Sequence, residues 1–81
     1  MARISGKVDE QGALKRLGVS IRAARKAKGY SQEALADLAE IDRSHMGKIE
    51  RGERNVSLLN LIRVSNALTC KPSDLLGKAD L

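Results

Sequence analysis

Aromatic residues are nearly absent from this chain, which has one tyrosine, Tyr30, and neither phenylalanine nor tryptophan. Proteins that bind single strands, and the common RNA-binding modules, stack bases on aromatic rings. The composition therefore excludes a stacking platform of that kind. If the chain binds a nucleic acid, duplex DNA is the better candidate.

Cysteine and long apolar runs are equally scarce. Cys70 is the only cysteine, which rules out an intrachain disulfide and a zinc site. It lies in the apolar run 67–70, and we interpret it as a small buried hydrophobe rather than a reactive thiol. No stretch is long enough to cross a membrane, and the N-terminus lacks the apolar core of a signal peptide. We expect a cytoplasmic protein that holds no metal and no cofactor.

The chain is short and basic. Its 81 residues allow one domain, over 1–81. A chain this short buries only a modest fraction of its surface, so a dimer partner would add to its stability. A net charge of +5 favours a polyanionic partner. The charge is uneven, because residues 15–28 hold six basic residues and no acid, whereas residues 31–41 hold three acids and no base.

Apolar spacing at helical intervals predicts an all-α, five-helix bundle, and no strand pattern is evident. The expected helices cover about 10–28, 32–39, 43 to 50 or 51, 58–68 and 72–77. Side chains suited to capping precede three of them, namely Ser31, Asp42 and Ser57. Residues 1–8 are expected to form a flexible arm, and residues 78–81 a frayed tail.

The apolar stripes predict which side chains the bundle buries. The inward residues expected are Leu14, Leu17, Ile21, Ala24, Leu35, Leu38, Ile41, Met46, Ile49, Leu58, Leu61, Val64, Ser65 and Leu68. Leu59 and Ile62 then fall to one side of the helix over 58–68. If the pair is exposed, it forms an apolar patch of the kind that marks an interface, and we favour a homodimer interface here. The alternative is that the last helix or Leu81 covers the pair.

Residues 29–52 read as two short helices joined by a tight turn, the layout of a helix-turn-helix. With Met46 and Ile49 inward, the second helix turns Arg43, Ser44, Gly47 and Lys48 outward and places His45 on a flank. This outward set is short, polar and rich in donors, which suits the floor of a major groove.

At these residues the chain resembles the phage repressor and Cro-like helix-turn-helix family, also called the XRE family. The matching pieces are Ile21, Arg22, Arg25 and Gly29; Ser31, Gln32, Leu35 and Ala36; and Ile49, Glu50, Arg51 and Gly52 followed by 61–68. In register they cover about 14–77. The resemblance implies a five-helix bundle whose third helix enters the major groove, and the short controllers of restriction–modification systems look most similar.

The resemblance also implies roles for individual residues. Arg43, Ser44 and Lys48 match base-contacting positions, with His45 close to them, and either Arg43 or Lys48 suits a guanine. Gln32 matches a glutamine that clamps a phosphate at a helix N-terminus. The residues expected to follow the sugar–phosphate backbone are Arg51, Arg54 and Asn55. Arg25 and Glu50 match an ion pair that orients the reading helix.

One position departs from the family pattern, because Glu40 stands where the turn between the two helices usually carries glycine. Glycine adopts positive φ freely, whereas glutamate pays about 1 kcal/mol for it. Either Glu40 is mildly strained or the turn differs slightly.

Two functions remain in view. The first is a homodimeric transcriptional regulator on a two-fold symmetric operator of duplex DNA. The alternative is an antitoxin that binds a toxin and its own promoter, for which residues 1–8 are the only candidate grasping segment. An enzyme is poorly supported, because His45 has no evident carboxylate partner and the glycines form no phosphate-binding loop. No small-molecule effector site is evident.

Overall fold

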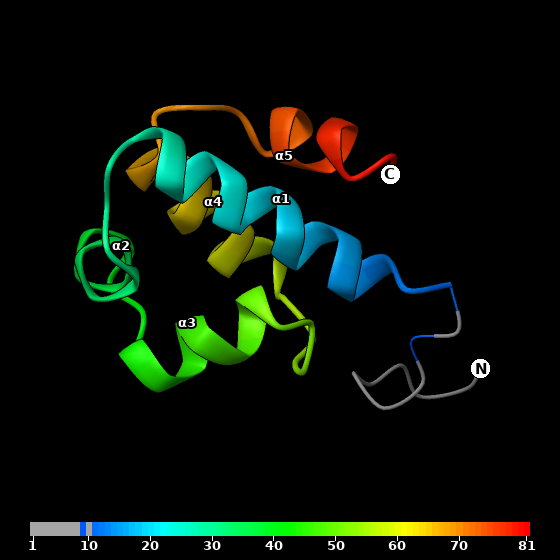
Figure 1. Cartoon of the computed structure of the whole chain (residues 1–81), viewed down its shortest axis with the longest axis horizontal. Coiled ribbons are helices and arrows are strands. Elements are labelled where there is room, and N and C mark those ends of the chain that lie inside the picture. The colour runs from blue at the N-terminus through cyan, green and yellow to red at the C-terminus, as the bar shows by residue number, and fades with distance from the viewer. Residues whose placement is uncertain (1–8, 10) are drawn as a thin grey trace.

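The computed structural model describes residues 9 and 11–81 and shows a bundle of helices without a strand in that part of the chain (Figure 1). The helices are α1 (Ala13–Ala27), α2 (Gln32–Ala39), α3 (Arg43–Glu50), α4 (Leu58–Ala67) and α5 (Pro72–Lys78). The all-α, five-helix prediction is confirmed. The predicted arm, residues 1–8, lies outside the described residues.

Three helices begin where the sequence supplies a side-chain cap. The Ser31 hydroxyl accepts from the Ala34 N–H at 3.0 Å, and the Ser57 hydroxyl accepts from the Asn60 N–H at 3.1 Å. At the start of α3, one carboxylate oxygen of Asp42 accepts two backbone N–H groups. Each cap satisfies donors that a helix N-terminus otherwise leaves unpaired, and the predicted starts of these helices are correct.

The outer limits of the bundle differ from the prediction. Helix α1 begins at Ala13 because Gly12 has a left-handed φ of 67°, and the Leu14 N–H donates to the Asp9 carboxylate at 3.0 Å. At the other end α5 continues through Lys78, Ala79 is buried, and the Leu81 N–H donates to the Leu76 carbonyl at 2.8 Å. The chain is thus hydrogen-bonded through 78–81, where the sequence predicted fraying.

Side chains from every helix meet in one apolar core. Its buried members are Leu17, Ile21, Leu35, Ala36, Ala39, Ile41, Met46, Ile49, Leu61, Val64, Leu68 and Leu75. Helix α1 packs on α3 and α5, while α2 packs on α3 and α4. Cys70 packs partly buried against this core, and its burial raises the pKa of its thiol. This agrees with a small hydrophobe rather than a reactive thiolate.

Two of the predicted core residues are wrong. Leu38 is 55% exposed and Leu58 is 69% exposed. Helix α2 buries Leu35, Ala36 and Ala39, and this narrow stripe leaves Leu38 on the solvent side. Leu58 is the first residue of α4, one turn before Leu61, where the buried stripe of that helix starts.

Helices α1 and α3 approach closely at Gly18. A Cβ added at Gly18 would lie 2.7 Å from the carbonyl oxygen of Ile49 and closer still to that of Glu50. At the end of α3, Gly52 has a φ of 73°, and an added Cβ there would lie 2.6 Å from the Cα of Lys15. Glycine therefore sets the distance between α1 and the helix that carries the predicted reading face.

We predict that Gly18→Ala lowers the free energy of unfolding by about 1–3 kcal/mol, because the new methyl group overpacks backbone that cannot move independently. The control is Gly77→Ala in α5, where an added Cβ meets nothing within 4 Å. That change should leave stability unchanged or raise it by up to about 1 kcal/mol. Urea unfolding measures both, and equal stability of the two variants would contradict the close approach.

Candidate nucleic-acid interface

The turn between α2 and α3 has the geometry of a glycine turn without the glycine. Glu40 adopts φ 57° and ψ 41°, and the Ile41 N–H donates to the Ala36 carbonyl at 2.9 Å. Of the two possibilities that the sequence left open, the structure therefore shows the strained one. The left-handed backbone costs about 1 kcal/mol at a residue with a side chain, and the turn is formed nevertheless.

A shallow hollow of about 380 Å³ marks the outward face of the helix-turn-helix. Its lining residues come from the start of α2 and from one side of α3: Gln32, Asp42, Arg43, Ser44, Gly47, Lys48 and Arg51. Three predicted base-contacting residues and two predicted phosphate-contacting residues thus share one surface. Gly47 forms its floor, since an added Cβ would lie 3.2 Å from the Gln32 Oε1 and 3.1 Å from an Arg51 nitrogen.

His45 is the predicted base-contacting residue that the structure separates from the others. It is half-buried and lines a different hollow, with Ile41, Asp42 and Asn60 among its neighbours. Its Nε2 is shielded from solvent and has no hydrogen-bond partner in the part of the chain described. The side chain thus faces α4 rather than the outward face of α3.

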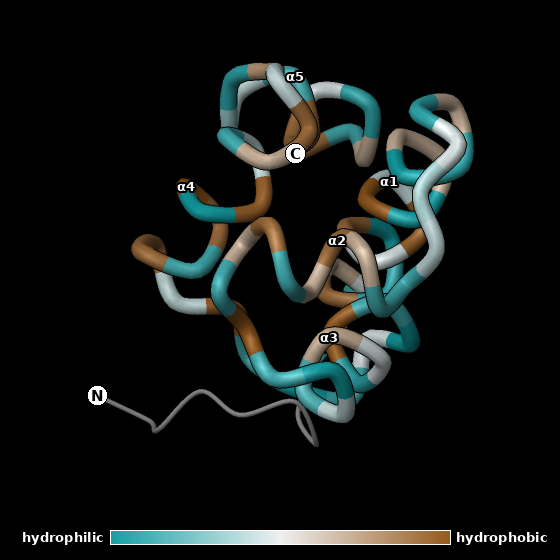
Figure 2. Tube along the Cα trace, turned by 90° about the vertical axis from the view of Figure 1, so that its left-hand side faces the viewer, coloured by the Kyte–Doolittle hydropathy of each residue, from teal (hydrophilic) through white to brown (hydrophobic). Residues whose placement is uncertain are grey.

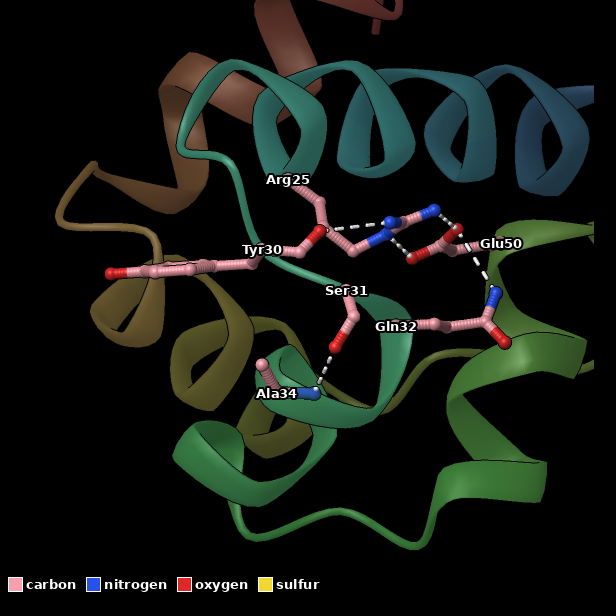
Figure 3. A network of polar contacts seen from close by, with 6 residues as sticks. All are labelled: Arg25, Tyr30, Ser31, Gln32, Ala34 and Glu50. Atoms are coloured by element: carbon pink, nitrogen blue, oxygen red, sulfur yellow. Dashed lines mark hydrogen bonds and ion pairs between the residues drawn. The ribbon is translucent and has the colours of Figure 1, made fainter.

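A buried ion pair ties α3 to the rest of the bundle (Figure 3). Arg25 on α1 donates from Nε to the Glu50 Oε2 at 2.8 Å and from a second nitrogen to Oε1 at 3.0 Å. The Arg25 and Glu50 side chains are only 11% and 3% exposed. Such a bidentate pair fixes orientation as well as distance, and the predicted contact between these residues is confirmed.

Two further partners complete this network, and sequence reasoning missed both. The Gln32 amide donates to the Glu50 Oε1 at 3.2 Å, which links α2 to α3. Arg25 also donates to the Tyr30 carbonyl at 3.0 Å, which holds the chain segment entering α2. The one hint in the sequence is Gly47, whose missing side chain leaves room for Gln32 beside α3. We call Arg25, Gln32 and Glu50 the orienting network.

Two exposed ion pairs lie beside the hollow. Arg43 approaches Glu33 at 3.6 Å, with both side chains more than half exposed. Arg51 donates to Glu53 at 2.7 Å, and this hydrogen bond lowers the pKa of Glu53 and raises that of Arg51. Surface pairs of this kind contribute little stability. Each arginine can therefore leave its glutamate and pair with another anion at small cost in free energy.

The remaining predicted contacts lie on the flanks. Arg54 and Asn55 are exposed in the segment between α3 and α4. On α4, Leu59 is 68% exposed and Ile62 is half-buried, so neither α5 nor Leu81 covers the leucine. Figure 2 shows hydrophobic segments of α4 along one side of the molecule. Leu58 adds to this apolar patch, which we call the α4 patch (Leu58, Leu59 and Ile62).

Among residues 9 and 11–81, no cluster of histidine, cysteine or acidic side chains has the grouping that a metal ion needs. No helix in the same part of the chain is long and apolar enough to span a membrane.

We predict that Arg25→Met and Glu50→Leu each lower the free energy of unfolding by about 3–5 kcal/mol, because each leaves one buried charge without its partner. The double variant should recover most of the loss, since neither charge then remains. Denaturant unfolding of all four proteins gives the coupling energy. Losses that simply add would mean that the two side chains do not act as a pair.

Comparison with known proteins agrees with this geometry. Residues 21–75 match the helix-turn-helix family. Control protein C.BamHI of Bacillus amyloliquefaciens is 45% identical over 60 residues, which cover 73% of this chain and 74% of the relative.

Solved structures share the architecture. The restriction–modification controller protein C.AhdI of Aeromonas hydrophila is 48% identical with a TM-score of 0.76, over 76% of this chain and 94% of that one. The biofilm regulator SinR, solved in complex with DNA, is 38% identical with a TM-score of 0.71, over 74% of this chain and 97% of that one. The chain therefore belongs to the helix-turn-helix family of XRE-type proteins.

Proposed function

We propose that this protein is a sequence-specific regulator of transcription that binds duplex DNA as a homodimer on a two-fold symmetric operator. The observation that carries the proposal is the outward face of α3. There Arg43, Ser44 and Lys48 share one open surface while the orienting network holds the helix behind them. A helix of this size fits the major groove, where base edges present a distinct pattern for each base pair.

Base reading is assigned to the side chains on this surface. Arg43 or Lys48 pairs with the O6 and N7 atoms of a guanine. Ser44 can hydrogen-bond to more than one kind of base and so assigns none. Arg43 must first leave Glu33, an exposed pair worth at most about 1 kcal/mol. A bidentate base contact contributes about 1–3 kcal/mol of discrimination, so the exchange is favourable. His45, which faces α4, would need a rotamer change to take part.

Phosphate contacts are assigned to Gln32, Arg51, Arg54 and Asn55. Gln32 opens α2, where free N–H groups and the helix dipole favour an anion. Its amide has two N–H donors, and only one is needed for the bond to Glu50. The second N–H can donate to a phosphate, which would couple the position of the DNA backbone to the orientation of α3.

The relatives favour one kind of regulator. Both C.BamHI and C.AhdI are controllers, and SinR is a regulator solved with DNA. We therefore propose a restriction–modification controller that acts where the DNA is, in the cytoplasm. The family is one of DNA-binding regulators rather than enzymes. None of the relatives named here is an antitoxin, and the only candidate segment for that role lies outside the described residues.

Dimerisation is assigned to the α4 patch. Its two leucines are more than two-thirds exposed, which is costly for a small protein that works alone. Pairing the patch across a two-fold axis buries the same side chains from both copies. The two α3 helices would then reach half-sites about one helical turn, ~34 Å, apart.

We predict that Arg43→Ala weakens binding to the preferred duplex by about 1–3 kcal/mol and relaxes base preference at one position of each half-site. The matched control is Lys71→Ala, which removes the same charge at the start of α5, on the far side of the molecule from α3 (Figures 1 and 2). Fluorescence anisotropy on the preferred duplex and on a scrambled duplex measures both. If the base preference of Arg43→Ala matches that of the control, Arg43 does not read a base.

We predict that Leu59→Asp combined with Ile62→Asp yields a folded monomer, because two carboxylates cannot be buried in an apolar interface. Sedimentation analysis gives the mass, and circular dichroism confirms that the helices remain. The control is Val19→Asp, on α1, which replaces a side chain that is 61% exposed outside the α4 patch. This variant should stay dimeric. A dimer that survives the double change would place the interface elsewhere.

A further inference from the structure

A second surface lies where α1 and α5 pack side by side, and it shares no lining residue with the outward face of α3. In both Figures 1 and 2, α5 lies at the end of the molecule opposite α3. Between α1 and α5 there is an open hollow of about 610 Å³. The proposed DNA and dimer contacts use none of the residues that line it. We call this surface the α1–α5 groove.

The floor of the groove is apolar and shallow. It is formed on α1 by Val19, Ala23 and Ala27, spaced four residues apart and all exposed, with Ala79 from the end of α5 beside them. Val19 alone is 61% exposed. Residues four apart lie on one face of a helix, and small side chains let a second helix approach closely. The floor therefore has the shape that an apolar helix face requires.

The rim of the groove is basic. Lys15 and Arg16 line it from α1 and Lys78 from α5, with Asp80 as the one acid in the lining. Helix α1 contains no acidic residue along its whole length. An adjoining hollow of about 410 Å³ continues as far as Lys28, and Leu68, Cys70 and a second acid, Asp74, also line it. At a rise of 1.5 Å per residue, the stretch from Lys15 to Lys28 spans about 20 Å.

Arg16, on the rim, is weakly hydrogen-bonded within the described residues. Its Nε is shielded from solvent and has no hydrogen-bond partner in the described part of the chain, and another nitrogen reaches the Asp80 carbonyl only at 3.5 Å. A guanidinium has five N–H donors in a planar fork that matches a carboxylate. An incoming carboxylate would pair with guanidinium nitrogens of Arg16 other than the shielded Nε, since this side chain is only half-buried.

We propose that the α1–α5 groove binds an acidic amphipathic helix of a protein partner. The apolar face of that helix would lie on Val19, Ala23 and Ala27, and its carboxylates would pair with Arg16 and Lys78. The groove length corresponds to about 13 residues of helix. Because the groove shares no lining residue with the outward face of α3, we expect the partner to bind while the protein remains on DNA, and the inference does not depend on which operator is read.

Other occupants fit the groove less well. Duplex DNA would match the basic rim but would leave the apolar floor unused. The α4 patch of a second copy is apolar, but α4 contains no acidic residue to pair with the rim. The chain's own acidic helix, α2, has 8 residues. At 1.5 Å per residue it covers about 12 Å of the ~20 Å groove.

The first test uses a synthetic peptide of about 14 residues, capped at both ends, long enough to span the groove. Leucine and alanine occupy one face of the peptide, and glutamate occupies the other. A second peptide replaces every glutamate with glutamine. Each is titrated into the ¹⁵N-labelled full chain. We expect amide shift changes confined to α1 and α5. The glutamate peptide should bind at least about tenfold more tightly than the glutamine peptide.

The second test separates the groove from general attraction to a basic protein. Ala23→Glu places a carboxylate on the apolar floor, whereas Ser73→Glu adds the same charge at an exposed residue of α5 that lines neither hollow. We expect Ala23→Glu to weaken peptide binding by about tenfold or more and Ser73→Glu to change it by less than about twofold. Val19→Ser, which only shortens the apolar floor, should give an intermediate loss and serves if Ala23→Glu unfolds.

Four results would overturn the proposal. Shift changes in α3 would mean that the peptide merely imitates DNA, and equal losses in Ala23→Glu and Ser73→Glu would mean that only net charge matters. Dissociation of the dimer by the peptide would make the groove an interface between copies. A loss of DNA affinity in Ala23→Glu well beyond that in Ser73→Glu would make the groove part of the DNA surface.

Discussion

The contact between Arg25 and Glu50 is the interaction on which the rest of the reading surface depends. Both groups are removed from water, so the pair contributes orientation more than stability. Glu50 is the last residue of α3. Its bonds to Arg25 on α1 and to Gln32 at the start of α2 fix the rotation of α3 about its own axis. A different rotation of α3 would turn its basic and polar side chains away from the outward surface.

Other constraints act on the same helix and agree with this pair. The left-handed turn at Glu40 sets the direction in which α3 leaves α2, and the Asp42 carboxylate defines its first residue. Gly18 brings the α1 backbone against the last turn of α3. One end of α3 is therefore set by local backbone chemistry and the other by tertiary packing. The strain at Glu40 is tolerated because these contacts jointly require that turn.

Much of this arrangement could be predicted from the sequence, and the limits of prediction have physical causes. The starts of α2, α3 and α4 were predictable because Ser31, Asp42 and Ser57 mark them locally. The exposure of Leu38 could not be predicted, because the sequence pattern of a leucine at helical spacing is the same whether or not a neighbouring helix packs against it.

The bond between Gln32 and Glu50 was equally hidden, since it depends on how closely α2 and α3 approach. His45 was placed correctly on a flank of α3, yet only the packing of α4 decides which way its side chain turns. Within the candidate site, local signals thus identified the outward side chains, whereas tertiary contacts decided which of them share a surface.

Sequence-specific reading by α3 is tested most directly by selecting binding sites for the whole chain from random duplex DNA at about 150 mM salt, where charge alone is largely screened. We expect an enriched motif with two-fold symmetry and half-sites about one helical turn apart. Affinity for all sequences alike, with no enriched motif, would contradict sequence-specific reading by α3, because a basic protein without a reading helix would give that result.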